Sequence, residues 1–458
     1  MKYKSLVINS TNKLLFGTAP YPVTTPRGLI IGGGHVYPEI NFTIPPMEIT
    51  EKTIPELIPY YKGIVSDTLE RAVHLNSEGI IVEFEPLIEM TRYPEIGVQL
   101  VKAMNDVCED FFQVHGMKSE LRLTPNDLRE FDKPPKQRTS AYLEPMMELF
   151  ERGANAGGDL LSIESTGGKE VSDDAIMMCD IKKFIFSQAV LGVRDIKMLW
   201  GKIVGIAKKT GKIPGGDTAC GFANTAMILA DRKYIPKIFA AIARIATIVR
   251  TLAAIEEGAT GPDKDCGYEG PFLKAITGIP ISMEGKTAAC AHLSPVGNIA
   301  AACADLWSNE SVQNIKLLSG MAPVAYLEQL EYDTRIMNQA IKDGEDTWLK
   351  LQDLFVKSDS YHDPQAFILA PENVITISAE IVKGENYVDA TLRGCKKGLE
   401  LIENAQKEGL LKRDEMEDTW LESLKTELYN MPADEEKLVE DVLPTIDQNK
   451  IILSEYGL

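Results

Sequence analysis

Three glycine-rich turns along the chain each carry a side chain that can bind a metal ion. Glu164 follows a short apolar run and opens into the first turn. Cys220 lies in the Gly- and Asp-rich stretch Gly215–Gly221, and Cys266 lies in the similar stretch Gly261–Gly267. One carboxylate and two thiolates would supply three protein ligands and leave the fourth position of a catalytic zinc ion open. The sequence therefore suggests a zinc site made of Glu164, Cys220 and Cys266.

Other cysteines and histidines compete for this role. Cys290 and His292 are the rival ligands, but their spacing of two residues places them on different faces of a helix, so both could bind one ion only in an extended segment. Cys220 and Cys266 are 46 residues apart, and the chain has no C-x-x-C pair, so spacing alone does not decide between these sets. The remaining cysteines lie in helical patterns, where a lone Cys is usually a small buried apolar residue. These are Cys108, Cys179, Cys303 and Cys395.

The composition excludes several classes of protein. With 458 residues, 44% hydrophobic and 25% charged, the chain is typical of a soluble globular protein with a large core. A formal net charge of −19 argues against a nucleic-acid partner. We find no apolar run long enough to cross a membrane and no signal peptide at the N-terminus. Seven cysteines do not form a disulfide framework, so we expect a cytoplasmic protein with reduced thiols.

The sequence predicts alternating strands and helices, and these elements must position the three turns. Apolar runs at 29–34, 79–85, 120–123 and 157–163 predict strands, and weaker candidates lie at 279–282, 315–318 and 374–377. Helical patterns separate them, and the runs recur at intervals of roughly 40 to 50 residues, as expected for parallel βα units. The number of units and the chain length favour an α/β fold of the TIM-type (β/α)8 barrel. The ligand turns would then share the carboxyl end of the barrel.

Three regions follow from this pattern. Residues 1–27 are polar and Pro-rich and predict an N-terminal extension. Residues 28–384 form the predicted barrel catalytic domain, and residues 385–458, which are helical and acidic in pattern, form an appended helical region. Thr166–Lys169 resembles the end of a phosphate loop. However, it lacks the earlier Gly, and Glu170 stands where Ser or Thr must bind magnesium, so we reject that interpretation.

A family resemblance appears in the strings around the two cysteines. They are GGDTACGFANT at Gly215–Thr225, DCGYEGP at Asp265–Pro271 and ISMEGK at Ile281–Lys286. The chain resembles the zinc-containing subunit of methanol:corrinoid methyltransferase across most of its length, most densely from Glu164 to Ser319. That resemblance implies an α/β barrel with extra helices, and a zinc ion held by Glu164, Cys220 and Cys266. It also implies a corrinoid-binding partner protein, methanol as substrate, and a homodimeric core within a heterotetramer.

The expected chemistry needs a Lewis acid, because hydroxide is a poor leaving group. Zinc polarises the C–O bond of methanol while the Co(I) corrinoid attacks the methyl carbon. A proton must reach the departing oxygen, and Asp217, Asp265 and Glu269 are the candidates that lie near in sequence.

Two alternatives to methanol chemistry stay open. One is a related zinc barrel that uses a methoxylated aromatic or a methyl thiol as methyl donor. The other is a non-catalytic subunit in which zinc is structural, which would need a fourth protein ligand such as Cys290 or His292.

Overall fold

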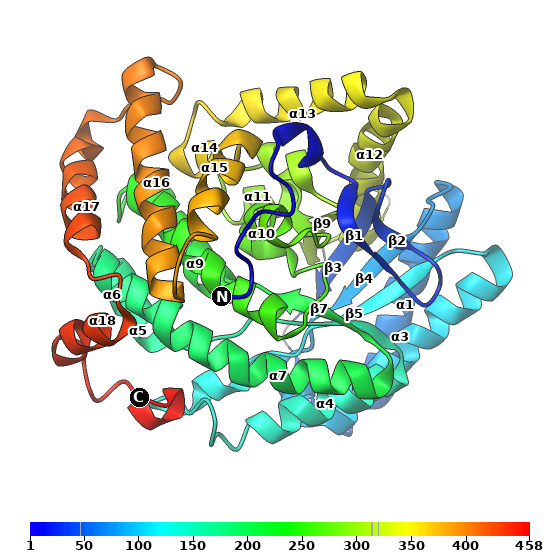
Figure 1. Ribbon diagram of the computed structural model, residues 1–458. Helices are drawn as coiled ribbons and strands as arrows, with labels where there is room; N and C mark the ends of the chain where they lie inside the picture. Colours follow the sequence, from blue (N-terminus) through cyan, green and yellow to red (C-terminus); the bar gives the residue numbers. More distant parts are fainter. Residues whose placement is uncertain (46, 313–314, 319) are drawn as a thin grey trace.

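Within the residues that the structure describes, seven parallel strands form one curled sheet at the centre of the molecule (Figure 1). The structure, a computed structural model, describes residues 1–45, 47–312, 315–318 and 320–458. The strands are β3 (Tyr37–Thr43), β4 (Ile80–Phe84), β5 (Ser119–Leu123), β6 (Gly158–Ile163), β7 (Ile213–Asp217), β8 (Ser282–Glu284) and β9 (Leu306–Val312). Their order in the sheet is β7-β6-β5-β4-β3-β9-β8.

An extended segment, residues 259–264, fills the gap between the two edge strands. The backbone N–H groups of Thr260 and Gly261 donate to carbonyl oxygens of β7 at 2.8 and 2.9 Å. On the other side, the N–H of Ser282 in β8 donates to the Asp263 carboxylate at 3.0 Å. The segment therefore occupies the sixth of eight strand positions. This arrangement confirms the predicted TIM-type barrel.

Helices follow each strand position and surround the sheet (Figure 1). The main ones are α1 (Ile54–His74), α3 (Pro94–His115), α4 (Leu143–Ala156), α7 (Val193–Thr210), α9 (Lys237–Glu257), α10 (Gly270–Thr277), α11 (Lys286–Ala291) and α12 (Ala322–Asp343). Shorter helices lie in the connections: α2 (Ile88–Arg92), α5 (Lys169–Met177), α6 (Ile181–Ile185) and α8 (Thr225–Asp231). Each βα unit places the loop after its strand at the same end of the barrel.

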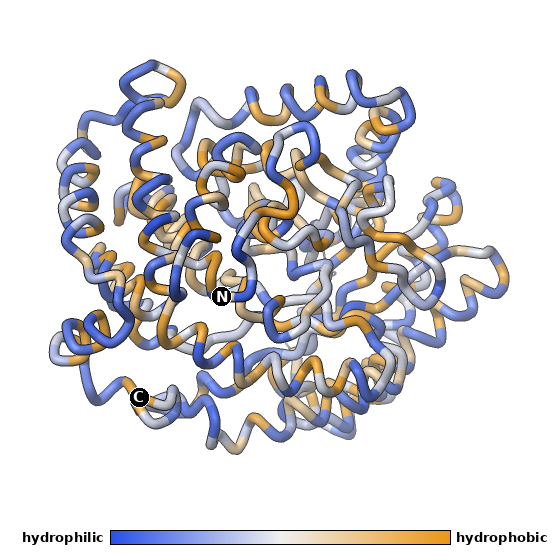
Figure 2. Tube along the Cα trace, viewed as in Figure 1, coloured by the Kyte–Doolittle hydropathy of each residue, from blue (hydrophilic) through white to orange (hydrophobic). Residues whose placement is uncertain are grey.

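The chain then continues as helices packed beside the barrel. These are α13 (Glu345–Asp359), α14 (Pro364–Leu369), α15 (Pro371–Ile381), α16 (Tyr387–Glu408), α17 (Asp418–Asn430) and α18 (Glu435–Val442). α16 packs against α9 and α15, and α17 packs against α16. Figure 2 shows hydrophilic and hydrophobic stretches alternating along outer helices such as α16, as expected where one face is buried.

α9 is a long apolar helix of the barrel wall. It is long and apolar enough to span a membrane, with a mean hydropathy of 1.9, but that stretch is entirely buried inside the fold. It is therefore a core helix in this structure. Its two arginines, Arg244 and Arg250, are buried completely as well.

A hairpin closes the amino end of the barrel. β1 (Thr18–Thr24) and β2 (Ile30–Gly33) pair antiparallel, outside the parallel sheet. Leu29 and Ile31 of this hairpin pack on residues near the amino ends of the barrel strands. Those residues are Tyr37, Ile81, Leu160 and Leu306. The run at 29–34 is thus a strand, but it belongs to the hairpin rather than to the barrel.

Two of the weaker strand predictions are wrong. Residues 315–318 form an exposed loop, and residues 374–377 lie in α15, where Val374 and Ile377 face the core with helical spacing. Conversely, β3 and β9 lack a clear apolar run in the sequence. β3 carries buried Glu39 and Asn41, because its inward side faces a polar barrel interior.

A buried ion pair crosses that interior. Arg122 of β5 donates from Nε to Oε1 of Glu39 at 2.5 Å, and both side chains have no exposed surface. Nη1 of Arg122 also donates to Ser162 Oγ and to the Pro262 carbonyl. Ser282 donates to the other oxygen of Glu39. The pair therefore connects four strands with the 259–264 segment.

We expect Arg122→Leu to destabilise the fold by about 3–5 kcal/mol, because it leaves the Glu39 carboxylate buried and unpaired. Chemical denaturation of the purified protein would measure the change. Arg71→Leu is the control: it removes a partly exposed pair with Glu328 and should cost less than about 1 kcal/mol. Equal effects in the two variants would contradict a special role for the buried pair.

Candidate metal centre

The three turns singled out in the sequence lie at the carboxyl end of the barrel. Glu164 follows β6 directly. Cys220 begins a turn of π-helix (Cys220–Asn224) after β7, and Cys266 lies in a 3-10 turn (Asp265–Gly267) after the 259–264 segment. Because the carboxyl ends of parallel strands meet at one end of the barrel, adjacent strand positions bring these side chains together.

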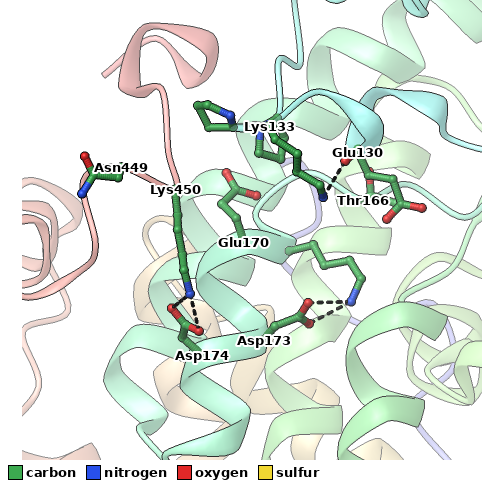
Figure 3. Close-up of a pocket in the computed structure, with 11 residues that line it drawn as sticks. Glu130, Lys133, Thr166, Glu170, Asp173, Asp174, Asn449 and Lys450 are labelled. Carbon is green, nitrogen blue, oxygen red and sulfur yellow. Dashed lines mark hydrogen bonds and ion pairs between the residues drawn. The ribbon is translucent and has the colours of Figure 1, made fainter.

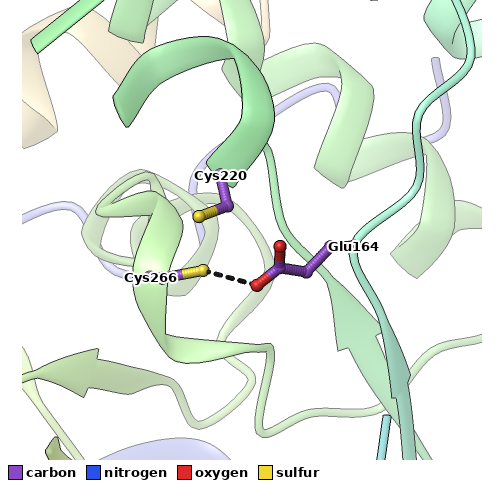
Figure 4. A group of neighbouring side chains, drawn as sticks. All are labelled: Glu164, Cys220 and Cys266. Carbon is purple, nitrogen blue, oxygen red and sulfur yellow. Dashed lines mark hydrogen bonds between the residues drawn. The ribbon is translucent and has the colours of Figure 1, made fainter. Parts of the chain in front are cut away.

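Figure 4 shows the three side chains converging from separate segments. One ligand atom from each of Glu164, Cys220 and Cys266 lies within 4.8 Å of the other two, and Cys266 Sγ is 3.0 Å from Glu164 Oε1. Around a tetrahedral zinc ion, Zn–S bonds of about 2.3 Å and Zn–O bonds of about 2.0 Å would separate the ligand atoms by roughly 3.5 to 3.8 Å. The donor set and its spacing therefore fit zinc.

The thiols of this cluster are strongly destabilised as thiolates without a cation. A hydrogen bond with Cys266 lowers the pKa of the Cys220 thiol, but burial and the nearby Glu164 and Glu284 raise it more, to about 12. Burial, the Cys220 thiol and the Glu164 carboxylate raise the pKa of Cys266 well above its usual value. Asn224 donates to Cys220 Sγ at 3.4 Å and to the Cys266 carbonyl at 2.6 Å, which links the two cysteine turns.

Arg250 of α9 fixes the turn that carries Glu164. Its Nη1 donates to the Gly167 carbonyl at 2.6 Å, and its Nη2 donates to the carbonyl and the hydroxyl of Ser165 at 2.8 Å. Its guanidinium also lies over the Phe222 ring, 4.1 Å from the centroid. Since Phe222 follows Cys220 by two residues, one buried arginine holds two of the three ligand turns.

Arg244 of the same helix holds the third turn. Its Nη1 donates to the Gly267 carbonyl, next to Cys266, and its guanidinium lies over the Tyr268 ring at 5.3 Å. Arg244 has no exposed surface. α9 therefore positions all three ligand turns from the core side.

The proton donors suggested by the sequence have other contacts in the structure. Asp217 accepts hydrogen bonds from Ser165, Thr218 and Trp200, and burial raises its pKa to about 6 against the opposing charge of Arg250. Among the described residues, Asp217 does not line the cavity at Glu164.

Glu269 also accepts hydrogen bonds from neighbouring groups. Among the described residues, it does not line the cavity at Glu164. It accepts from the Ala219 N–H and the Thr251 hydroxyl, both at 2.7 Å. The Asp265 side chain lies outside the described residues. A proton-donor role for any of the three stays a prediction.

A cavity of about 220 Å³ opens beside Glu164. Its lining is polar apart from Pro125, Gly221 and Phe222, and it also contains Glu85, Thr124, Asn126, Asp127, Glu130, Ser165, Thr166 and Lys169. In the sequence, Glu85 is only the acidic end of a predicted strand, and nothing there marks it as a site residue. Its placement next to Glu164 comes from the neighbouring positions of β4, β5 and β6 in the barrel.

Lys264 connects Glu85 to the ligand set. This fully buried lysine lies 2.6 Å from Glu85 Oε1, 3.2 Å from Glu83 Oε1 and 3.6 Å from Glu164 Oε1. Burial raises the pKa of Glu85 to about 7, although Lys264 opposes the shift. Lys264 thus supplies positive charge to an otherwise acidic barrel mouth.

The rival ligands lie outside this cluster. Cys290 is exposed on α11. His292 lies between Glu284, 3.1 Å from Nδ1, and Glu310, 3.4 Å from Nε2. Hydrogen bonds to both carboxylates raise its pKa to about 11, so it is a protonated partner of an ion-paired triad. The triad is a second group with metal-binding residue types at close range, separate from the cluster of Glu164, Cys220 and Cys266.

Comparison with known proteins shows which family the chain belongs to. The model of the methanol-cobalamin methyltransferase B subunit family, MtaB, matches residues 1–457. The chain belongs to this family. The family member is 38% identical, over 446 residues, to the methanol–corrinoid protein co-methyltransferase of Methanosarcina barkeri (strain Fusaro / DSM 804), covering 96% of this chain and 95% of the relative. It is therefore a methyltransferase of the methanol–cobalamin class.

A solved structure gives the same result for the fold. The chain superposes on a chain of the methanol:cobalamin methyltransferase complex MtaBC from Methanosarcina barkeri with a TM-score of 0.95. The two chains are 36% identical, and the match covers 100% of this chain and 99% of the other. The barrel and its additional helices are thus shared along the whole chain.

Zinc uptake at pH 7 should release about two protons per ion, because both thiols start protonated and must bind as thiolates. An indicator dye in weakly buffered solution would measure them. The affinity for zinc should accordingly fall as the pH is lowered. Cys220→Ala should release about one proton, whereas Cys395→Ala, which removes a buried thiol of α16, should release two. Full zinc binding without proton release would contradict thiolate ligation.

Proposed function

We propose that Glu164, Cys220 and Cys266 hold a zinc ion beside a bound methanol molecule, and that the methyl group passes to the Co(I) corrinoid of a partner protein. The observation that carries this proposal is the open three-ligand cluster at the mouth of the barrel, in a chain of the methanol-cobalamin methyltransferase family. The ion, when bound, supplies Lewis-acid polarisation of the C–O bond. The residues of the chain must set the charge around the ion and the size of the substrate cavity.

The ligand set controls which oxygen species is favoured. Two thiolates and one carboxylate carry three negative charges, which exceed the charge of a zinc ion. The surrounding Glu83 and Glu85 add further negative potential, which Lys264 offsets only in part. Such a site favours neutral methanol over hydroxide or methoxide, so the oxygen keeps its own proton, and a second proton must still reach it for it to leave as water.

The cavity beside Glu164 supports methanol over a larger donor. Its volume of about 220 Å³ lies below the range of about 300–1,000 Å³ typical of sites for drug-sized ligands. Phe222 is its one aromatic lining residue within the described part of the chain, and the other side chains are mostly polar. A methoxylated aromatic would need a larger apolar slot, so this alternative is disfavoured.

A purely structural zinc is also disfavoured. Structural zinc sites are closed by four protein ligands. The cluster in the described residues contains three, and the two rivals, Cys290 and His292, are respectively exposed and held by Glu284 and Glu310. An open position on the metal is what a substrate requires.

We further propose that a corrinoid protein docks at this end of the barrel. One related Methanosarcina barkeri enzyme is named for its action on a corrinoid protein, and a related solved structure from Methanosarcina barkeri is a methanol:cobalamin methyltransferase complex. We also propose a homodimeric core within a heterotetramer, in a reducing cytoplasm. All seven cysteines are free, which suits such a compartment.

Removing the metal should abolish methyl transfer. With methanol and a corrinoid reduced to Co(I), the zinc form should produce methyl–Co(III), followed by the cobalt absorption spectrum. The metal-free form should be slower by at least about 100-fold, because Lewis-acid stabilisation is worth several kcal/mol. Adding zinc back should restore the rate. A metal-free protein that is equally fast would refute the proposal, and activity confined to another methyl donor would change the substrate.

Glu164→Gln should separate binding of the ion from its function. The variant keeps an oxygen ligand but removes one negative charge, so zinc content should remain while the rate falls at least about tenfold. Metal analysis and the same spectroscopic assay would measure both. Glu144→Gln, the same change at an exposed position of α4, is the control. An unchanged rate in Glu164→Gln would remove Glu164 from the mechanism.

A further inference from the structure

The glycine turn that carries Glu164 is also held by the C-terminal segment of the chain, residues 447–458. This segment contains a short 3-10 turn, Leu453–Tyr456. Tyr456 is completely buried, and its hydroxyl accepts from the Gly168 N–H at 2.8 Å. The same hydroxyl donates to Glu170 Oε1 at 2.6 Å. Because Gly168 follows Glu164 by four residues, a side chain distant in sequence fixes the same turn that Arg250 holds from α9.

Other contacts hold the C-terminal segment in place without this hydroxyl. Glu455 accepts from the backbone N–H groups of Arg138 and Thr139 at 2.5 and 3.0 Å. Lys450 binds both carboxylate oxygens of Asp174 on α5 at 2.8 and 2.7 Å (Figure 3). The segment would therefore remain docked if only the tyrosine hydroxyl were removed.

The turn is closely packed on its other sides. Gly168 has a φ of +84°, and a Cβ atom at this position would lie 2.6 Å from the Ser187 carbonyl oxygen. The Thr166 N–H donates to the Asp127 carboxylate at 2.9 Å, and Arg250 binds two carbonyl oxygens of the turn. Within this set of contacts, the tyrosine supplies the acceptor for the buried Gly168 N–H. A buried N–H left without an acceptor is costly, so the turn would shift toward water or another acceptor if the hydroxyl were lost.

We propose that Tyr456 is a positioning residue for the metal centre, because its hydroxyl fixes the backbone of the turn and so keeps the Glu164 carboxylate where it retains the ion. This inference rests on the proposed function, which makes Glu164 a zinc ligand. Tyr456 acts through the turn and not on the reacting atoms. Loss of a contact made directly to a ligand typically lowers metal affinity about 10–100-fold, and this contact acts through the backbone, so we expect the lower end of that range.

Tyr456→Phe tests this proposal, because it removes the hydroxyl and keeps the buried ring. Mixed with an excess of the chromophoric chelator 4-(2-pyridylazo)resorcinol, the zinc-loaded variant should release zinc about tenfold faster than the wild type. With cobalt(II) in place of zinc, the thiolate-to-cobalt and d–d absorption bands of the variant should change, since they report the ligand geometry.

Tyr387→Phe is the matched control. It removes a buried hydroxyl that donates to Glu256, near the end of α9 that leads into the 259–264 segment. Because that hydroxyl contacts no ligand turn, zinc release should stay within about twofold of the wild-type rate, and the cobalt spectrum should be unchanged.

Two outcomes would overturn the assignment. One is zinc release from Tyr456→Phe at the wild-type rate, and the other is an equal acceleration in Tyr387→Phe, which would reduce the effect to a general loss of stability. Should Tyr456→Phe fail to fold, amide hydrogen exchange of the wild type decides. The Gly168 N–H should be protected as strongly as amides of the core, and exchange as fast as in exposed loops would contradict the inference.

Failure of the proposed function gives a different result. If the zinc-loaded wild type does not methylate a Co(I) corrinoid from methanol, that function fails, whereas a tenfold difference in zinc release still supports the role of Tyr456. Methyl transfer together with equal zinc release has the opposite meaning. A wild type that binds no zinc would overturn both.

Discussion

The candidate metal centre depends on a charged side chain, Arg250, that is buried where a charge is costly. Arg250 has no exposed surface, yet it extends from the apolar helix α9 to Ser165, Gly167 and the face of Phe222. A buried guanidinium is tolerated only when its donors are satisfied and opposite charge is near. The turn after β6 provides acceptors for Nη1 and Nη2, and Asp217 provides the charge, whereas Nε has no hydrogen-bond partner among the described residues. The ligand turns therefore have little freedom to move, since any shift would leave this cation without partners.

Buried charges paired with opposite charges also occur inside the barrel. A TIM barrel is usually filled by branched apolar side chains, but here Arg122 pairs with Glu39, and Lys264 with Glu83 and Glu85. The first pair lies within the barrel, and Lys264 of the second group also lies 3.6 Å from Glu164 Oε1. Such networks are stable only as complete sets, because removing one member leaves a buried charge. An acidic mouth that can hold a dication beside a neutral alcohol is thus supported by compensating charges placed below it.

This polar interior also explains what the sequence could and could not predict. β4, β5 and β6 carry apolar runs, and the sequence predicts them, together with the barrel that they imply. β3 and β9 place Glu, Asn and Ser on their inward side, so they do not resemble buried strands. Lone Cys and Glu residues in Gly-rich turns were a local signal, and the structure brings Glu164, Cys220 and Cys266 together. The role of Glu85 depends on which strands are neighbours, and a single sequence does not contain that information.

The two ends of the barrel impose a direction on the reaction. At the amino end, Leu29 and Ile31 of the hairpin pack on apolar strand residues, and Arg27 of its turn pairs with Glu120 and Asp159. At the carboxyl end, charged side chains line open cavities. We therefore expect methanol and the cobalt to reach the ligand set from the carboxyl end, because the three ligand turns and the cavity beside Glu164 lie there.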